Sequence, residues 1–190
     1  MCDMHLAMER GRFKDHLMPK MSLRLHSDSR STLERVEVEA IRDTAGLLHL
    51  TYSVSGALDR VAIPGAQLSA RTDELWKHTC FELFLGATSG YYELNFSPSS
   101  QWAAYRFDAY RAGMRDALLA DPTIEWRATD GQGVLTVTVQ LPHDATGPLG
   151  VSTVIENIDG DRSFWALAHA AGPPDFHNAA CFTAELPPAG

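Results

Sequence analysis

The chain has 190 residues, of which 45% are hydrophobic and 21% are charged, and this is the composition of one ordinary globular domain. The formal net charge of −8, with scattered Lys and Arg, excludes the basic surface that nucleic acid or an anionic membrane requires. Because no stretch approaches the ~20 apolar residues of a membrane span, we expect neither a nucleic-acid partner nor a membrane partner.

The first 20 residues differ in pattern from the rest of the chain. They carry charges throughout, lack the apolar centre of a secretory signal, and show no strand-like alternation. We therefore predict a mobile extension over residues 1–20, a single domain over residues 21–190, and a cytoplasmic location. Cys80 and Cys181 lie in strand-like apolar runs, which predicts buried thiols, although a disulfide between them stays open.

Short alternating segments separated by turn residues follow the extension. Residues 36–41 and 47–56 alternate like a β-hairpin with one wet face. Residues 79–85, 91–96 and 101–107, with turns at 86–90 and 97–100, predict a three-strand antiparallel meander. Further strands are expected over 123–129, 134–141, 151–158, 163–169 and 181–186. Residues 108–119 could hold a helix weakened by Gly113, or an irregular excursion. The pattern predicts an all-β antiparallel sandwich or barrel of about ten strands.

Polar side chains fall among apolar ones in the predicted meander. A period of two places Glu82 with Cys80 on one face of the first strand, and Glu93 with Asn95 on one face of the second. We hypothesise that Glu82, Asn95 and Arg106, one from each strand, lie side by side as a polar floor. The alternatives are a structural Glu–Arg pair, and a pair of carboxyl groups, Glu82 and Glu93, whose cross-strand spacing favours a structural role.

Aromatic and histidine side chains near this floor are further candidates. Trp76 precedes the first meander strand on a loop, and Trp165 shares a face of a late strand with His169. Either Trp could stack on a flat ligand or pack in the core. His169 and His177 lie in one loop and could hold a metal, although their spacing is not that of a helical zinc site.

Three segments together, ARTDELWKHTCFELFL, YYELNFSPSSQWAAYRFDAYRAGM and FWALAHAAGPPDFHNAACFTAEL, resemble the small bacterial DOMON-like proteins, which are related to the family 9 carbohydrate-binding modules. The resemblance covers about residues 21–186 and implies an immunoglobulin-like β-sandwich with a ligand site on one sheet. In those modules two Trp clamp a sugar while Glu, Asn and Arg bond its hydroxyls, which implies roles for Trp76, Glu82 and Asn95 here. Arg106 and Trp165 are further candidates for this set. In DOMON cytochromes a Met and a His ligate haem, and Met114 is the one Met in the body of the domain.

These features give one leading hypothesis and two alternatives. The leading hypothesis is a non-enzymatic protein without a resident cofactor, which binds an intracellular sugar, a nucleotide sugar or another small polyol. The first alternative is an enzyme acting on a sugar or cell-wall precursor, with Glu82 as acid or base and His169 or His177 assisting. The second is haem or metal binding through His169 and His177. The oligomeric state stays open.

Overall fold

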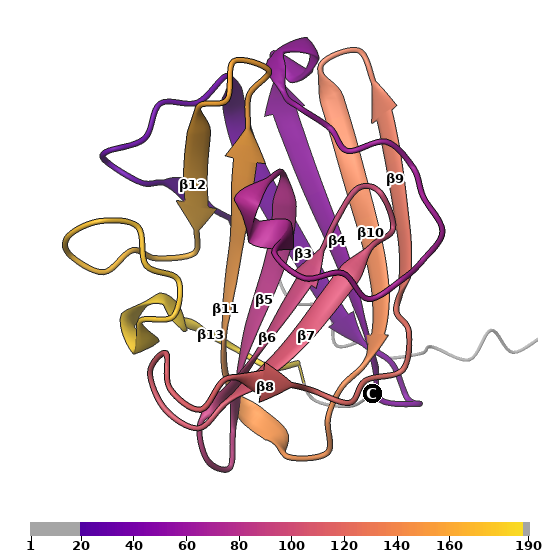
Figure 1. Cartoon of the computed structure of the whole chain (residues 1–190), viewed down its shortest axis with the longest axis vertical. Coiled ribbons are helices and arrows are strands. Elements are labelled where there is room, and N and C mark those ends of the chain that lie inside the picture. Colours follow the sequence, from indigo (N-terminus) through magenta and orange to yellow (C-terminus); the bar gives the residue numbers. More distant parts are fainter. Residues whose placement is uncertain (1–19, 188–190) are drawn as a thin grey trace, which may run out of the picture.

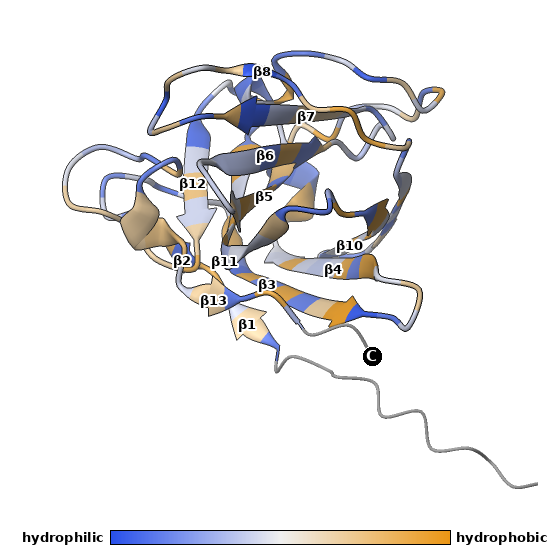
Figure 2. Cartoon of the chain, turned by 90° about the horizontal axis from the view of Figure 1, so that it is seen from below, coloured by the Kyte–Doolittle hydropathy of each residue, from blue (hydrophilic) through white to orange (hydrophobic). Residues whose placement is uncertain are grey.

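The computed structural model of the chain describes residues 20–187, which form two antiparallel sheets packed face to face. Figures 1 and 2 show the two layers, with β3, β4, β9 and β10 in one and β5, β6, β7, β11 and β12 in the other. The predicted all-β antiparallel sandwich is confirmed. The predicted extension over residues 1–20 lies outside the described residues except for Lys20, whose Nζ lies 2.9 Å from Glu37 Oε2.

The first sheet has five strands in the order β1-β3-β4-β10-β9. Their bounds are β1 (Met21–Ser22), β3 (Leu33–Arg42), β4 (Leu47–Gly56), β10 (Gln132–Gln140) and β9 (Thr123–Thr129). The expected hairpin corresponds to β3 and β4. In β4 the side chains of Leu48, Leu50, Tyr52 and Val54 are buried and alternate with half-buried polar ones, as one core-facing side requires.

The second sheet has eight strands, seven of them in the order β2-β12-β11-β5-β6-β7-β8, with β13 paired to β11. Their bounds are β2 (Arg24–Leu25), β12 (Arg162–Ala166), β11 (Ala145–Glu156), β5 (Cys80–Ala87), β6 (Tyr91–Phe96), β7 (Trp102–Phe107), β8 (Arg115–Asp116) and β13 (Ala184–Glu185). The predicted meander is β5-β6-β7 and is confirmed.

One predicted strand differs from the structure, and the structure decides between the two alternatives for the segment after the meander. Of the strand expected over residues 181–186, only the two residues of β13 are in a strand, and Cys181 is the last residue of a 3₁₀ turn, η3 (Ala179–Cys181). Residues 108–114 form an irregular loop, which is the second of the two expected alternatives and not the helix. Gly113 in this loop has φ 68°, and a Cβ there would lie 2.2 Å from Asp108 Oδ2. Cys80 and Cys181 are free and buried, which confirms the buried thiols.

Both faces of the meander are buried. Phe81, Leu83 and Leu85 of β5 pack in the core between the sheets. Cys80 and Phe84 point to the outer face and belong to a second apolar cluster. Three segments contribute to covering that face: the turn η2 (Leu75–Lys77), the β7–β8 loop, and the long loop after β12 (Figure 1). A further short turn, η1 (Leu58–Arg60), follows β4. None of the helical turns in residues 20–187 has the length and hydropathy to cross a bilayer.

Candidate functional site

A cavity of about 340 Å³ lies on the outer face of the eight-stranded sheet. Glu82 of β5 and Glu93 of β6 supply carboxyl groups to its lining from the sheet itself. The aromatic part of the wall comes from the sheet and from the covering loops: Trp76, Phe84, Phe107, Phe164 and Phe176. The lining is therefore mostly apolar, with two acidic groups at its floor, which is the usual character of a small-molecule site.

Glu82 is held in place by its cross-strand neighbours. It pairs with Asn95 on β6 and with Ser152 on β11, and Ser152 Oγ donates a hydrogen bond of 2.8 Å to Glu82 Oε2. Only 2% of the residue is exposed. This burial, followed by the charge of Glu93, raises the pKa of Glu82 to about 8. The carboxyl is therefore mainly protonated at pH 7 and can donate as well as accept hydrogen bonds.

Glu93 lines the cavity with support from Asn95. The Asn95 Nδ2 group donates a 2.8 Å hydrogen bond to Glu93 Oε1. Asn95 is fully buried and is not part of the lining, so it orients Glu93 from beneath. Burial raises the pKa of Glu93, and the hydrogen bond from Asn95 partly opposes that rise. The alternation of β6 already placed both residues on one face, but it did not indicate that Glu93 borders a cavity.

His177 enters the cavity wall from the loop after β12. Its Nδ1 lies 2.8 Å from the Tyr91 hydroxyl, which accepts a 3.1 Å hydrogen bond from the backbone N–H of Arg111. The Tyr91 hydroxyl proton is then free to be donated to Nδ1, and we infer that Nε2 carries the ring proton. Burial lowers the pKa of His177 to about 4, so the ring is neutral at pH 7. Its 3.6 Å approach to Glu93 Oε2 is therefore not an ion pair at that pH.

Asp175 ties together two of the covering loops. Tyr110 donates a 2.7 Å hydrogen bond to Oδ2, and Arg111 donates one of 2.8 Å to Oδ1, both from the β7–β8 loop. Burial raises the pKa of Asp175, but these bonds outweigh it and leave the pKa below its ordinary value. Because Arg111 and Phe176 line the cavity, the Asp175 bonds hold two parts of its wall together.

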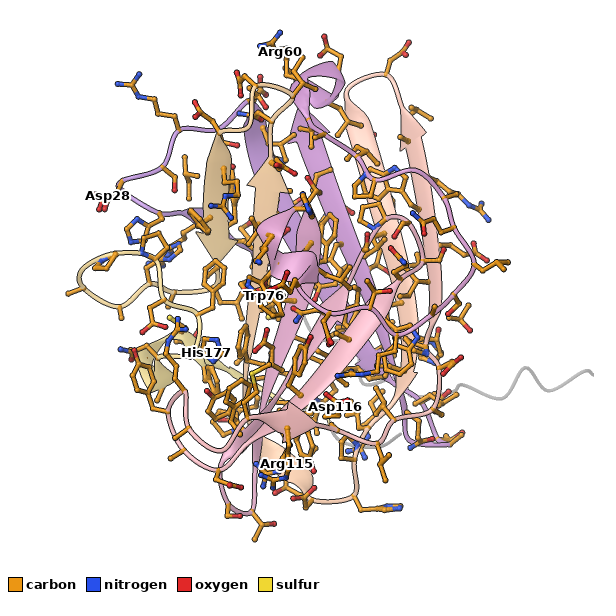
Figure 3. The ribbon with its side chains drawn as sticks, viewed as in Figure 1. Asp28, Arg60, Trp76, Arg115, Asp116 and His177 are labelled. Atoms are coloured by element: carbon orange, nitrogen blue, oxygen red, sulfur yellow. The ribbon has the colours of Figure 1, made fainter. Side chains whose placement is uncertain are left out.

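The structure brings Trp76 and Glu82 together in the lining of this cavity, as the sequence predicted for two residues of one site. Trp76 lies in η2 and packs edge-on against Tyr105, with ring centroids 5.9 Å apart. Figure 3 shows Trp76 and His177 on the same side of the eight-stranded sheet, although they come from segments far apart in the sequence.

The predicted side-by-side arrangement is confirmed for Glu82 and Asn95, which are direct cross-strand partners, and is wrong for Arg106. On β7 the residue opposite Asn95 is Ala103, and Arg106 is instead opposite Tyr92. Arg106 therefore projects from the other face of the sheet. There its guanidinium lies 4.7 Å from the Tyr92 ring centroid and donates to backbone carbonyls, including a 3.2 Å bond to Tyr91 O. It neither lines the cavity nor neutralises Glu82.

Trp165 and His169 do not lie in the cavity lining either. Trp165 is 5% exposed and packs in the core between the sheets, where its Nε1 donates a 3.3 Å bond to Ser163 Oγ. The structure thus does not place a second Trp where the resemblance implied a clamp, and Phe164, its neighbour on β12, faces the cavity instead. His169 Nε2 lies 2.8 Å from the carbonyl of Arg24.

The two histidines do not fit a shared metal or haem site. His177 has Nδ1 hydrogen-bonded to Tyr91, and its Nε2, to which we assign the ring proton, faces Glu93 at 3.6 Å. His169 does not line the cavity: its ring centroid lies 6.2 Å from that of Phe176, and its Nε2 lies against the carbonyl of Arg24. Met114 does reach the cavity. Within residues 20–187, no three His, Cys, Asp or Glu side chains are arranged to hold a metal ion.

The sequence matches no protein-family model and no curated protein. The fold does have a known counterpart. The chain is similar in structure to a protein from Bacteroides uniformis described as "a putative carbohydrate-binding protein", with a TM-score of 0.51 and 16% sequence identity. The similarity covers 87% of this chain and 84% of that one. At this identity the match shows a shared β-sandwich fold.

Proposed function

We propose that this protein binds a small carbohydrate or a similar polyol in the cavity on the outer face of its eight-stranded sheet. The observation that carries the proposal is that Trp76 and two buried carboxyl groups, those of Glu82 and Glu93, line one cavity. The face of an indole ring packs well against the C–H groups of a sugar ring, and carboxyl groups accept hydrogen bonds from its hydroxyls.

The volume of the cavity and the protonation of Glu82 support this proposal. About 340 Å³ falls within the range of cavities that hold small molecules. A protonated Glu82 can bond a hydroxyl in either direction, while Glu93, held by Asn95, is oriented to accept. The fold similarity to the protein described as carbohydrate-binding agrees with the proposal but does not carry it.

Tryptophan fluorescence tests the proposal, because one of the four Trp lines the cavity. Titration with a panel of monosaccharides and disaccharides is expected to change the emission of the wild type. Trp76→Phe is expected to lose the change and to bind about fivefold more weakly by calorimetry, since stacking on a large aromatic face contributes on the order of 1 kcal/mol.

Trp126→Phe is the matched control, because Trp126 lies on β9 of the opposite sheet. It is expected to keep both the fluorescence change and the affinity of the wild type. Unchanged binding in Trp76→Phe would remove Trp76 from the site, and the absence of binding to the whole panel would end the carbohydrate proposal.

A second candidate function is catalysis on a bound sugar, and the pKa of about 8 at Glu82 is what favours it. A carboxyl that stays protonated near neutral pH can serve as a general acid. If the protein is an enzyme, Glu82→Gln is expected to abolish turnover of a nitrophenyl glycoside panel while retaining binding. Equal turnover in Glu82→Gln and wild type would exclude Glu82 as the acid.

A further inference from the structure

We infer that the ligand of this cavity carries a positively charged amine, as an amino sugar does, and that Glu82 and Glu93 recognise it. The inference rests on the proposed function for the site, and it adds a chemical group that a neutral sugar lacks. Three features of the lining carry it: two acidic groups without a cationic partner, a wall rich in aromatic rings, and the position of the arginines.

The two carboxyl groups are close enough to influence each other and have no cation between them. Glu82 and Asn95 are directly opposite, so Glu93, two residues from Asn95, is the diagonal neighbour of Glu82 on the same face. Within residues 20–187, no Lys or Arg forms an ion pair with either Glu, and the histidine beside Glu93 is neutral at pH 7. A bound ammonium would favour the ionised form of Glu82, which is otherwise mainly protonated at pH 7, and would then pair with both carboxylates.

One oxygen of Glu82 is available for this purpose. Ser152 donates to Oε2, whereas Oε1 accepts no hydrogen bond from residues 20–187. Oε1 is also not one of the fully buried, unpaired polar atoms in that part of the chain, so some of its surface is accessible. Since Glu82 lines the cavity, Oε1 is the atom that a ligand can reach. On Glu93, Asn95 occupies Oε1 and leaves Oε2 facing His177 at 3.6 Å, a gap longer than a hydrogen bond.

The aromatic wall favours a cation over an anion. The faces of aromatic rings carry negative charge density and attract ammonium groups, most strongly where water is excluded. Five aromatic side chains line a cavity of about 340 Å³, and four of them are Phe, which offer no hydrogen bond to a sugar hydroxyl: Trp76, Phe84, Phe107, Phe164 and Phe176. The wall therefore suits a charged amine at least as well as a neutral hydroxyl.

The two arginines of the lining do not cancel the acidic floor. Arg111 forms its ion pair with Asp175 at 2.8 Å. Its charge still lowers the pKa of Glu93, but burial outweighs this effect and leaves that pKa raised. Arg162 is exposed and begins the short strand β12, so it lies at the margin of the site. The cavity is thus acidic at its floor and basic at its edge, an order that would orient an amine inward.

Isothermal titration calorimetry at pH 7 with five probes tests the inference. The probes are glucose, glucosamine, N-acetylglucosamine, glucuronate and choline, which share a small size and differ in charge. We expect glucosamine to bind about tenfold more tightly than glucose, because a charge-assisted bond adds roughly that factor. Acetylation of the amine is expected to remove the gain, and glucuronate is expected to bind more weakly than glucose.

Glu82→Gln and Glu93→Gln, which keep the side-chain shape, are each expected to reduce the preference for glucosamine over glucose. Glu125→Gln is the matched control, since Glu125 is exposed on β9 and its one ion pair among residues 20–187 is with Arg127. It is expected to keep the full preference. Circular dichroism of each variant checks that the sandwich remains folded, and the comparison of probes on the wild type does not depend on any variant.

Each outcome separates this inference from the proposed function. Equal binding of glucose and glucosamine, or tightest binding of glucuronate, would overturn the amine and leave carbohydrate binding standing. Binding of choline without any sugar, lost in Glu82→Gln, would support the amine and overturn the carbohydrate. Failure of all five probes to bind would overturn the inference, and the wider sugar panel then decides the proposed function by itself.

Discussion

Glu82 owes its raised pKa to its place in the fold rather than to its sequence neighbours. The alternation of β5 turns Glu82 away from the core between the sheets and onto the outer face. On that face a charged residue would ordinarily meet water. The covering segments remove that water, and the nearby Glu93 adds an unfavourable charge. The same residue type on an uncovered sheet face would keep an ordinary pKa.

The raised pKa of Glu82 predicts a dependence of stability on pH. In the unfolded chain Glu82 releases its proton near pH 4.5, whereas in the folded state it holds the proton until about pH 8. Its contribution to stability is therefore full below pH 4.5 and is lost as the pH rises toward 8, at up to about 1.4 kcal/mol per pH unit. Glu82→Gln cannot titrate, so its free energy of unfolding should fall less steeply than that of the wild type over this window.

Urea unfolding of both proteins at several pH values between 5 and 8 measures this difference. His177, whose folded pKa is lowered to about 4, has the opposite effect, because its contribution to the stability of the protein decreases as the pH falls. This contribution is the same in both proteins and cancels in the comparison. Glu125→Gln should retain the slope of the wild type. Parallel slopes for Glu82→Gln and wild type would show that Glu82 ionises normally in the folded state.

The covering loops are the elements that convert a sheet face into a cavity. The β7–β8 loop and the loop after β12 lie far apart in the sequence, and Asp175 joins them through Tyr110 and Arg111. These side chains are partly exposed, so the bonds add little to global stability. Their effect is to restrict the motion of the two loops relative to each other, and through them the closure of the cavity.

Asp175→Asn tests this role. The change removes the ion pair with Arg111, and we expect the free energy of unfolding to fall by about 1 kcal/mol or less. Amide hydrogen exchange over residues 108–114 and 172–178 should nevertheless become several-fold faster, and bound ligand should dissociate more quickly. Asp108→Asn is the control. Asp108 lies in the β7–β8 loop and pairs with Arg115 of β8, so this ion pair does not bridge the two loops. Equal exchange rates in Asp175→Asn and wild type would contradict the role.

At the scale of the whole molecule, the two sheets differ in how far their outer faces are buried. The five-stranded sheet buries one face against the core, and many side chains on its other face reach solvent, as its alternating burial indicates. The eight-stranded sheet is buried on both faces along β7 and most of β5 and β6, so it can carry polar groups away from bulk water. The fold similarity extends over 87% of the chain and includes both sheets of a β-sandwich.

The sequence by itself determined the fold class, the meander and the side chains that share a face within each strand, because these follow from a period of two and from local turn residues. It also singled out Trp76 and Glu82. It did not decide the register between strands. A shift of one residue moves a side chain to the opposite face, which is why Arg106 was predicted beside Asn95 and lies behind it.

Only the tertiary structure decided which outer-face residues border a cavity. Glu93 and His177 join Glu82 there because loops that are distant in sequence close over the sheet, and no local pattern encodes such a meeting. The same closure withdraws water from both carboxyl groups, which is the physical cause of their raised pKa values and of the charge preference that we infer for the site.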